Sequence, residues 1–160
     1  MTGSRSLRLL APISGVVVPL DEVPDAAFAE RLVGDGVAID PLDRLVVAPC
    51  DAVVRQVHPS GHAVTLDAEG LELVIHVGID TVLLRGTGFE PLVVAGDRVT
   101  AGTPLVRVDV DLVAGRARSL VTPVLVASMD AVVTLEVVAH GRVRAGEDVL
   151  LRIVHTATAA

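Results

Sequence analysis

Short valine-rich runs, separated by Gly, Pro and Asp, recur along the whole chain and restrict its fold more than any other feature. Val is β-branched and favours strands, whereas Gly, Pro and Asp favour the turns between strands. Only two short segments, Ala26–Leu32 and Leu112–Arg118, look helical. The sequence therefore predicts an all-β fold, an antiparallel β sandwich or barrel-like structure with short helical turns. The runs expected to form strands are Gly15–Leu20, Arg44–Val47, Ala52–Val57, His62–Asp67, Leu71–Val77, Leu105–Val108, Ser119–Val126, Val132–Val138 and Asp148–Val154.

The core must be built from aliphatic side chains, because 51% of the 160 residues are hydrophobic but only 1% are aromatic. A chain of this length forms one ordinary domain and buries enough surface to fold without disulfide bonds. We expect residues 1–10 to be an N-terminal tail, residues 11–154 to form a single domain and residues 155–160 to be a C-terminal tail.

Two weak internal repeats suggest a duplicated β motif. Residues 11–17 (APISGVV) resemble residues 48–54 (APCDAVV), and residues 93–102 resemble residues 137–146. Common turn and strand residues in a sequence of low diversity would produce similar matches. A solenoid is not expected, because only about two copies are visible and stacked arrays need at least three.

Charge and composition exclude several classes of function. The formal charge is −7, and without a basic cluster or many aromatic residues the chain is a poor binder of nucleic acid. The acidic balance instead fits a basic protein partner. All thirteen Lys and Arg positions are Arg, so the chain cannot carry biotin or lipoate and cannot form a Schiff base.

The same features indicate a cytoplasmic location. Cys50 is the only cysteine, which excludes an internal disulfide and suits a reducing compartment. The apolar part of residues 1–10 is too short for a signal peptide. No apolar run approaches the roughly 18 residues that a membrane span needs.

Two of the five histidines are brought together by a predicted hairpin. Gly70 is suited to close a three-residue loop over residues 68–70 in the left-handed conformation. With that loop, His62 lies directly opposite His76, and opposed residues have Cβ atoms about 4.5–5.5 Å apart on one face of the sheet. The register alone thus predicts a pair of adjacent imidazoles.

A pair of imidazoles has several uses, and its geometry leaves them open. The pair could be two polar residues on a solvated strand, or it could bind a metal with Asp80 or Asp35 as a third ligand. A serine hydrolase has little support, because Ser60 is not part of a Gly-x-Ser-x-Gly element. A shared phosphoryl group is chemically coherent, because a neutral imidazole is a nucleophile and its neighbour can donate an N–H to the added charge.

The sequence closely resembles the glucose-type IIA components of the bacterial sugar phosphotransferase system, from about Ala11 to Ile153. The stretches that carry the resemblance are Ala11-Pro12-Ile13-Ser14-Gly15, Val23-Pro24-Asp25 with Phe28-Ala29-Glu30, Gly34-Asp35-Gly36-Val37-Ala38-Ile39, Val47-Ala48-Pro49, Gly61-His62-Ala63, Ile75-His76-Val77-Gly78-Ile79-Asp80-Thr81-Val82, Gly86-Thr87-Gly88-Phe89, Thr122-Pro123-Val124 and Ser128-Met129-Asp130.

The resemblance implies an antiparallel β fold and a chain of transfer from enzyme I to HPr, to IIA, to the IIB domain of a IIBC sugar permease, and then to sugar. His76 matches the histidine that is phosphorylated on Nε2, and His62 matches the second active-site histidine. Ser60 matches the hydroxyl residue that orients His62. No organic cofactor and no catalytic metal are implied.

The resemblance also implies a partner-binding surface. Asp35 and Asp80 match acidic residues that face a basic partner. The family has more Phe around the histidine pair, whereas this chain has Val64, Val74 and Val77 near it, and we include these three in the partner surface.

The remaining histidines and the two phenylalanines have simpler expectations. His58, His140 and His155 match no functional residue of the family and are expected on the surface. Phe28 and Phe89 are expected in the core rather than at an interface.

The resemblance therefore predicts a cytoplasmic phosphocarrier that reaches the membrane only through its permease. One alternative is a regulatory protein of the same fold that binds partners according to its phosphorylation. A less favoured alternative is a zinc-dependent hydrolase on a related fold. The sugar and any regulatory partners are not predicted.

Overall fold

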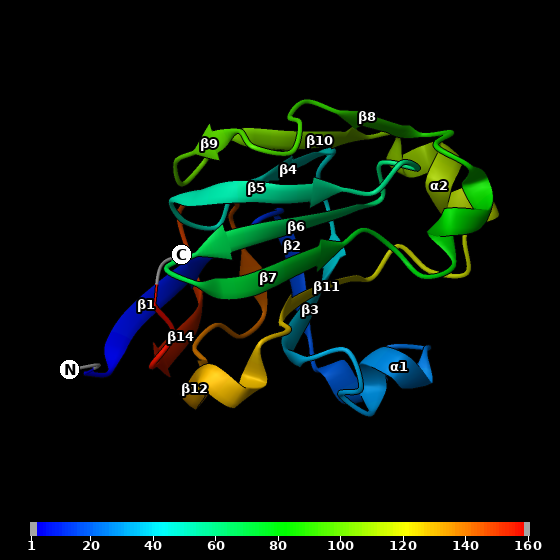
Figure 1. Cartoon of the computed structure of the whole chain (residues 1–160). Coiled ribbons are helices and arrows are strands. Elements are labelled where there is room, and N and C mark those ends of the chain that lie inside the picture. Colours follow the sequence, from blue (N-terminus) through cyan, green and yellow to red (C-terminus); the bar gives the residue numbers. More distant parts are fainter. Residues whose placement is uncertain (1–2, 159–160) are drawn as a thin grey trace.

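A computed structural model describes residues 3–158 as antiparallel strands with a few short helices (Figure 1). The described strands form no closed barrel, and the antiparallel all-β prediction is confirmed. The strands are β1 (Arg5–Leu10), β2 (Gly15–Val18), β3 (Asp35–Pro41), β4 (Leu45–Val47), β5 (Ala52–Val57), β6 (Ala63–Ala68), β7 (Leu71–His76), β8 (Phe89–Pro91), β9 (Arg98–Val99), β10 (Pro104–Val108), β11 (Thr122–Val126), β12 (Val132–Val137), β13 (Arg142–Val143) and β14 (Val149–His155). The helices are α1 (Ala26–Ala29) and α2 (Val110–Arg116), with 3-10 turns η1 (Leu20–Glu22), η2 (Thr81–Leu84) and η3 (Met129–Ala131).

Three sheets enclose the main core. The large sheet has the strand order β13-β2-β3-β11-β7-β6-β5-β9, and two small sheets have the orders β1-β14-β12 and β4-β10-β8. All three sheets contribute to one hydrophobic cluster, for example Leu9 from β1, Leu73 from β7 and Leu105 from β10. Burial of these aliphatic side chains from water is the main force that holds the sheets together.

A second, smaller cluster lies on the other face of the large sheet. Val124 and Val126 of β11 belong to the main core, whereas Leu125 between them packs with Phe28 of α1. This follows from the period of two along a strand, which sends successive side chains to opposite faces. Helix α1 thereby covers part of the sheet close to the end of β7 (Figure 1).

The structure confirms the duplicated β motif. Strands β2 and β5 begin in the two copies of the first repeat, residues 11–17 and 48–54. Strands β9 and β13 lie in the two copies of the second repeat, residues 93–102 and 137–146. Gly15 of β2 pairs with Val143 of β13, and Ala52 of β5 pairs with Val99 of β9. These four residues occupy matching places in the two repeats, so both copies use the same register at the two edges of the large sheet.

The predicted tails are wrong at residues 5–10 and at His155, whereas residues 3–4 and 156–158 form no strand. Arg5–Leu10 forms strand β1, which pairs with β14 and buries Leu9 completely. His155 ends β14 and is also fully buried. The cause is a long-range pairing between the two ends of the chain, which no local pattern reveals. Residues 1–2 and 159–160 of the expected tails lie outside the described residues.

Strand β3 was not predicted, because its glycines read as a turn. A Cβ at Gly34 or Gly36 would come within 2.2 Å or 2.1 Å of carbonyl oxygens on β11. Glycine therefore allows a close approach between β3 and β11. Both predicted helices are present with shifted ends, and α2 begins two residues early because the Asp109 carboxylate caps it by accepting from the Leu112 N–H.

Candidate active site

His76 is the last residue of β7 and is half-buried. Its ring lies 5.0 Å from the ring of Phe28 and 4.8 Å from that of His62, measured between ring centroids. A hydrogen bond of 2.8 Å joins its Nδ1 to the carbonyl oxygen of Gly78. Because a carbonyl only accepts, Nδ1 carries the hydrogen, and Nε2 of the neutral ring keeps a free lone pair.

The hairpin register differs by one residue from the prediction. Glu69 and Gly70 both have positive φ, 55° and 91°, and they form a two-residue loop rather than a three-residue loop. As a result β6 begins at Ala63, which pairs with His76, and His62 precedes the strand.

The two histidines still meet, for a reason other than direct opposition. Gly61 has φ 75° and turns the chain just before β6, while the carbonyl of His62 accepts from the Val77 N–H at 2.7 Å. The side chain of His62 therefore does not follow the alternation of side chains between the two faces of β6. Its ring meets that of His76 edge-on, with an interplanar angle of 77°.

Burial keeps both rings neutral near pH 7. Burial, together with the imidazoles of His76 and His58, lowers the pKa of His62 to about 4. Burial also lowers the pKa of His76, although the Gly78 carbonyl and the Asp25 carboxylate act in the opposite direction. A neutral His76 with a free Nε2 is a nucleophile, and His62 beside it can donate an N–H.

Ser60 does not orient His62 in this structure. Among the described residues, no hydrogen bond joins the Ser60 hydroxyl to His62, and Nδ1 of His62 is buried without a partner. The Ser60 backbone N–H instead donates to Nδ1 of His58 at 3.1 Å. The resemblance to the family was the basis for assigning this role to Ser60.

Comparison with known proteins decides the family. Residues 7–132 match the family described as phosphoenolpyruvate-dependent sugar phosphotransferase system, EIIA 1. The chain belongs to this EIIA family. As an EIIA component it is a phosphotransferase component of the sugar phosphotransferase system.

Relatives of this EIIA chain include domains of larger proteins. It is 46% identical over 142 residues to the PTS system glucose-specific EIICBA component of Staphylococcus carnosus, covering 88% of this chain and 21% of that protein. It is 44% identical over 147 residues to the N-acetylglucosamine-specific EIICBA component of Escherichia coli, covering 91% of this chain and 23% of that protein. The chain thus spans about a fifth of the length of these two relatives.

Two shorter relatives match the chain along most of their length. The glucose-specific EIIA component of Staphylococcus epidermidis is 40% identical over 79% of this chain and 76% of that protein. The solved structure of glucose permease IIA from Mycoplasma capricolum is 37% identical, with a TM-score of 0.86, and the match covers 92% of this chain and 96% of that one. These matches confirm the family resemblance and the fold.

Two of the three valines expected on the partner surface of this EIIA chain are misplaced. Val64 and Val77 are each only 1% exposed and belong to the main core, so neither side chain can reach a partner. Val74 is half-buried and packs against the smaller cluster beneath α1. The one-residue change of register caused part of this error, because it reassigns strand residues to the opposite face.

The two aspartates differ in how freely they could meet a basic partner. The Asp35 carboxylate accepts from the Arg31 guanidinium at 3.0 Å and from the Gly36 N–H at 2.8 Å. Asp80 is exposed, and within residues 3–158 its carboxylate forms an ion pair with Arg118 alone, at 3.9 Å. Asp80 therefore carries the less compensated charge.

The predictions about the two phenylalanines and the other three histidines have mixed outcomes. Phe28 and Phe89 are buried as predicted, and both lie beside the histidine pair. His140 is exposed as predicted, but His155 is fully buried. His58 was expected on the surface, yet it is half-buried with its ring 4.4 Å from that of His62.

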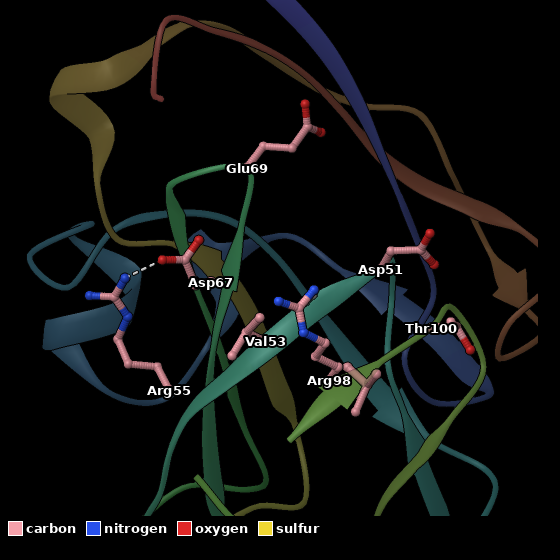
Figure 2. Close-up of a pocket in the computed structure, with 9 residues that line it drawn as sticks. Asp51, Val53, Arg55, Asp67, Glu69, Arg98 and Thr100 are labelled. Carbon is pink, nitrogen blue, oxygen red and sulfur yellow. Dashed lines mark hydrogen bonds and ion pairs between the residues drawn. The ribbon is translucent and has the colours of Figure 1, made fainter. Parts of the chain in front are cut away.

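A hollow of about 650 Å³ lies near the other end of the β6–β7 hairpin (Figure 2). Charged residues line it, among them Glu69, Arg98 and the ion pair of Arg55 with Asp67. Strands rise about 3.3 Å per residue, so Glu69 lies roughly 20 Å from His76 along β7. The histidines do not line this hollow.

Within residues 3–158, no three His, Cys, Asp or Glu side chains are grouped so that they could hold a metal ion. No helix in this part of the chain is long and apolar enough to cross a membrane.

Proposed function

We propose that this EIIA domain accepts a phosphoryl group from HPr on Nε2 of His76 and donates it to the IIB domain of a sugar permease. The observation that supports the proposal most is the bond from Nδ1–H of His76 to the Gly78 carbonyl, with His62 beside the free Nε2. That bond fixes the tautomer, so the nitrogen with the lone pair is the one left for attack.

The step requires little beyond positioning. Nε2 of His76 attacks phosphorus, a nitrogen–phosphorus bond forms, and the bond from phosphorus to the donor breaks with its electron pair remaining on the donor. The phosphorylated ring gains negative charge. His62 donates an N–H to the phosphoryl oxygens, which stabilises that charge in the transition state and in the product.

The partners follow from the family and from the charge of the surface. Asp80, with a smaller contribution from Asp35, faces a basic patch on HPr or IIB. The transfer takes place in the cytoplasm, and the domain meets the membrane only through its permease. Because two relatives carry the names glucose-specific and N-acetylglucosamine-specific, these are the first sugars to test.

A reconstituted relay tests the proposal. The protein is incubated with phosphoenolpyruvate, enzyme I and HPr, its intact mass is followed, and the modified nitrogen is mapped by NMR. We expect one phosphoryl group on Nε2 of His76, discharged when a IIB domain and its sugar are added. Phosphorylation on His62, or none at all with active HPr, would contradict the proposal.

A further inference from the structure

The imidazole of His62 is enclosed by other rings. It is only 3% exposed, with His58 at 4.4 Å, His76 at 4.8 Å and Phe89 at 6.3 Å between ring centroids. The side of His62 that meets His76 must stay available for a phosphoryl group. The cover on the remaining sides therefore comes from His58, the closest ring, and from Phe89.

The loop between β5 and β6 holds His58 firmly. The His58 N–H donates to the Ala63 carbonyl at 2.9 Å, and the His58 carbonyl accepts from the Gly61 N–H at 2.7 Å. Its ring is held as well, because Nδ1 accepts from the Ser60 N–H at 3.1 Å. Because both its backbone and its ring form hydrogen bonds, His58 is held in one position in the loop.

The two nitrogens of His62 differ in their surroundings. Nδ1 is buried and has no hydrogen-bond partner among the described residues, whereas Nε2 is not enclosed in this way. A buried polar atom without a partner attracts water wherever water can enter. The ring of His58 is the nearest aromatic ring to His62, with 4.4 Å between centroids and an interplanar angle of 55°. Nε2 remains as the nitrogen that can serve a phosphoryl oxygen.

We propose that His58 is a positioning residue, whose ring covers the imidazole of His62, excludes water from its Nδ1 and fixes its orientation toward His76. The consequence for phosphoryl transfer rests on the function proposed above, whereas the shielding of His62 does not. His58 takes the orienting role that the resemblance assigned to Ser60. The lowered pKa of His62 agrees with this arrangement, because burial is its largest cause.

The first test measures His62 itself, without any phosphoryl transfer. Two-dimensional ¹⁵N NMR of the unphosphorylated protein follows the titration of each imidazole in wild type, His58→Ala, His58→Phe and Ser60→Ala. Removal of the ring in His58→Ala admits water, so we expect the titration midpoint of His62 to rise by about one pH unit or more. His58→Phe keeps the cover, so its midpoint should stay close to the wild-type value.

The variants also separate this proposal from a loss of fold. His140→Ala, which removes an exposed histidine, is the matched control and should leave His62 unchanged. If His58→Ala is too unstable to measure, the pair of His58→Phe and His58→Leu retains a bulky side chain and still allows the comparison with Ser60→Ala. An unshifted His62 in His58→Ala, or a larger shift in Ser60→Ala than in the His58 variants, would overturn the proposal.

The second test connects shielding with transfer. In single-turnover donation to IIB, His58→Ala should be slower by about 10- to 100-fold, because small misplacements of a positioned group cost rates of this order. His58→Phe should restore most of the rate. If the relay fails for wild type while His62 still shifts in His58→Ala, the proposed function is wrong and the shielding role stands. If His58→Phe is as slow as His58→Ala, the ring cover is not what matters and the proposal fails.

Discussion

A buried histidine lies at each end of the β6–β7 hairpin, and the two histidines have different surroundings. At the open end, where β6 begins and β7 ends, His62 is 3% exposed, and near the tip at Glu69 the last residue of β14, His155, is fully buried. Each has one buried ring nitrogen without a hydrogen-bond partner among the described residues, Nδ1 of His62 and Nε2 of His155. Burial alone therefore does not distinguish the ring that we propose to take part in transfer from the other.

The difference lies in the neighbours of each ring. Nε2 of His155 lies 3.8 Å from the Glu69 carboxylate, which also lies 3.8 Å from the Arg5 guanidinium. Nδ1 of His155 accepts from the Ala157 N–H at 3.1 Å. His155 thus links the hairpin tip to the terminal strands, in a network of charges and backbone bonds.

The open end has rings where the tip has a carboxylate. His58, His76 and Phe89 surround His62, and no acidic residue in the described chain forms an ion pair with it. Such surroundings disfavour an imidazolium and preserve a neutral ring. A neutral ring can attack phosphorus or donate an N–H, which agrees with the proposal that transfer takes place at the end where no carboxylate pairs with His62 among the described residues.

The largest expected effect is the loss of His76. His76→Ala should abolish phosphorylation by HPr and leave the fold intact, because a half-buried ring at a strand end contributes little to the core. His155→Ala, at the other end, should lower stability but accept the phosphoryl group normally in the folded protein. Mass spectrometry after incubation with phosphorylated HPr measures acceptance, and His140→Ala is the control. A phosphorylated His76→Ala protein would remove the distinction between the two ends.

Loss of His62 should have the next largest effect. Removing one donor that stabilises a transition state costs on the order of 100- to 1000-fold, so His62→Ala should slow donation to IIB by this factor. His62→Gln keeps an N–H donor but cannot titrate, so it should still become phosphorylated while donating poorly. Single-turnover transfer in each direction is the measurement. Donation by His62→Gln at the wild-type rate would show that His62 is a bystander.

The pH dependence of stability should also reveal the environment of His62. Its folded pKa of about 4 lies below the roughly 6.5 of an unfolded histidine, so the unfolded state binds the proton first. The free energy of unfolding should therefore fall as pH drops from about 6.5 toward about 4. His62→Gln should show a shallower fall, measured by urea denaturation across this range. Parallel curves for the two proteins would contradict the lowered pKa.

The hairpin tip should be sensitive in stability but not in transfer. Gly70 has φ 91°, and a Cβ there would come within 2.2 Å of the Thr158 carbonyl oxygen. Gly70→Ala should cost about 1–3 kcal/mol in the free energy of unfolding. Gly96→Ala is the matched control, because Gly96 has φ 98° but nothing within 4 Å. Equal losses in the two variants would mean that the close approach to the C-terminal segment contributes nothing.

The smallest effect is expected for a surface charge near the open end. Asp80 has φ 59°, a conformation that Asn also tolerates, so Asp80→Asn changes the charge without disturbing the backbone. The association rate with HPr should fall a few-fold at low salt, and the difference should narrow as salt screens the charge. Asp130→Asn makes the same change of charge on η3 and is the control. If the two variants lower the association rate equally, the net charge of the protein, and not a docking contact of Asp80, determines the rate.

Much of the architecture could be predicted from local sequence. Alternating valine-rich runs indicated most strands, and the internal repeats suggested a duplicated β motif, which agrees with the matched pairings of β2 with β13 and β5 with β9. His62 and His76 were predicted as a pair from a hairpin with Gly70 at its turn, although the observed register places Ala63 rather than His62 opposite His76. These features depend on neighbours in sequence and on the period of two, so the chain alone determined them.

The tertiary structure decided which groups surround those histidines. Gly61 turns His62 out of the strand pattern, the loop places His58 beside its ring, and Ser60 bonds to His58 rather than to His62. The pairing of β1 with β14 and the burial of His155 likewise join residues from opposite ends of the chain. Local patterns cannot supply these contacts, because they arise where separately formed elements pack and where one residue of register exchanges the faces of a strand.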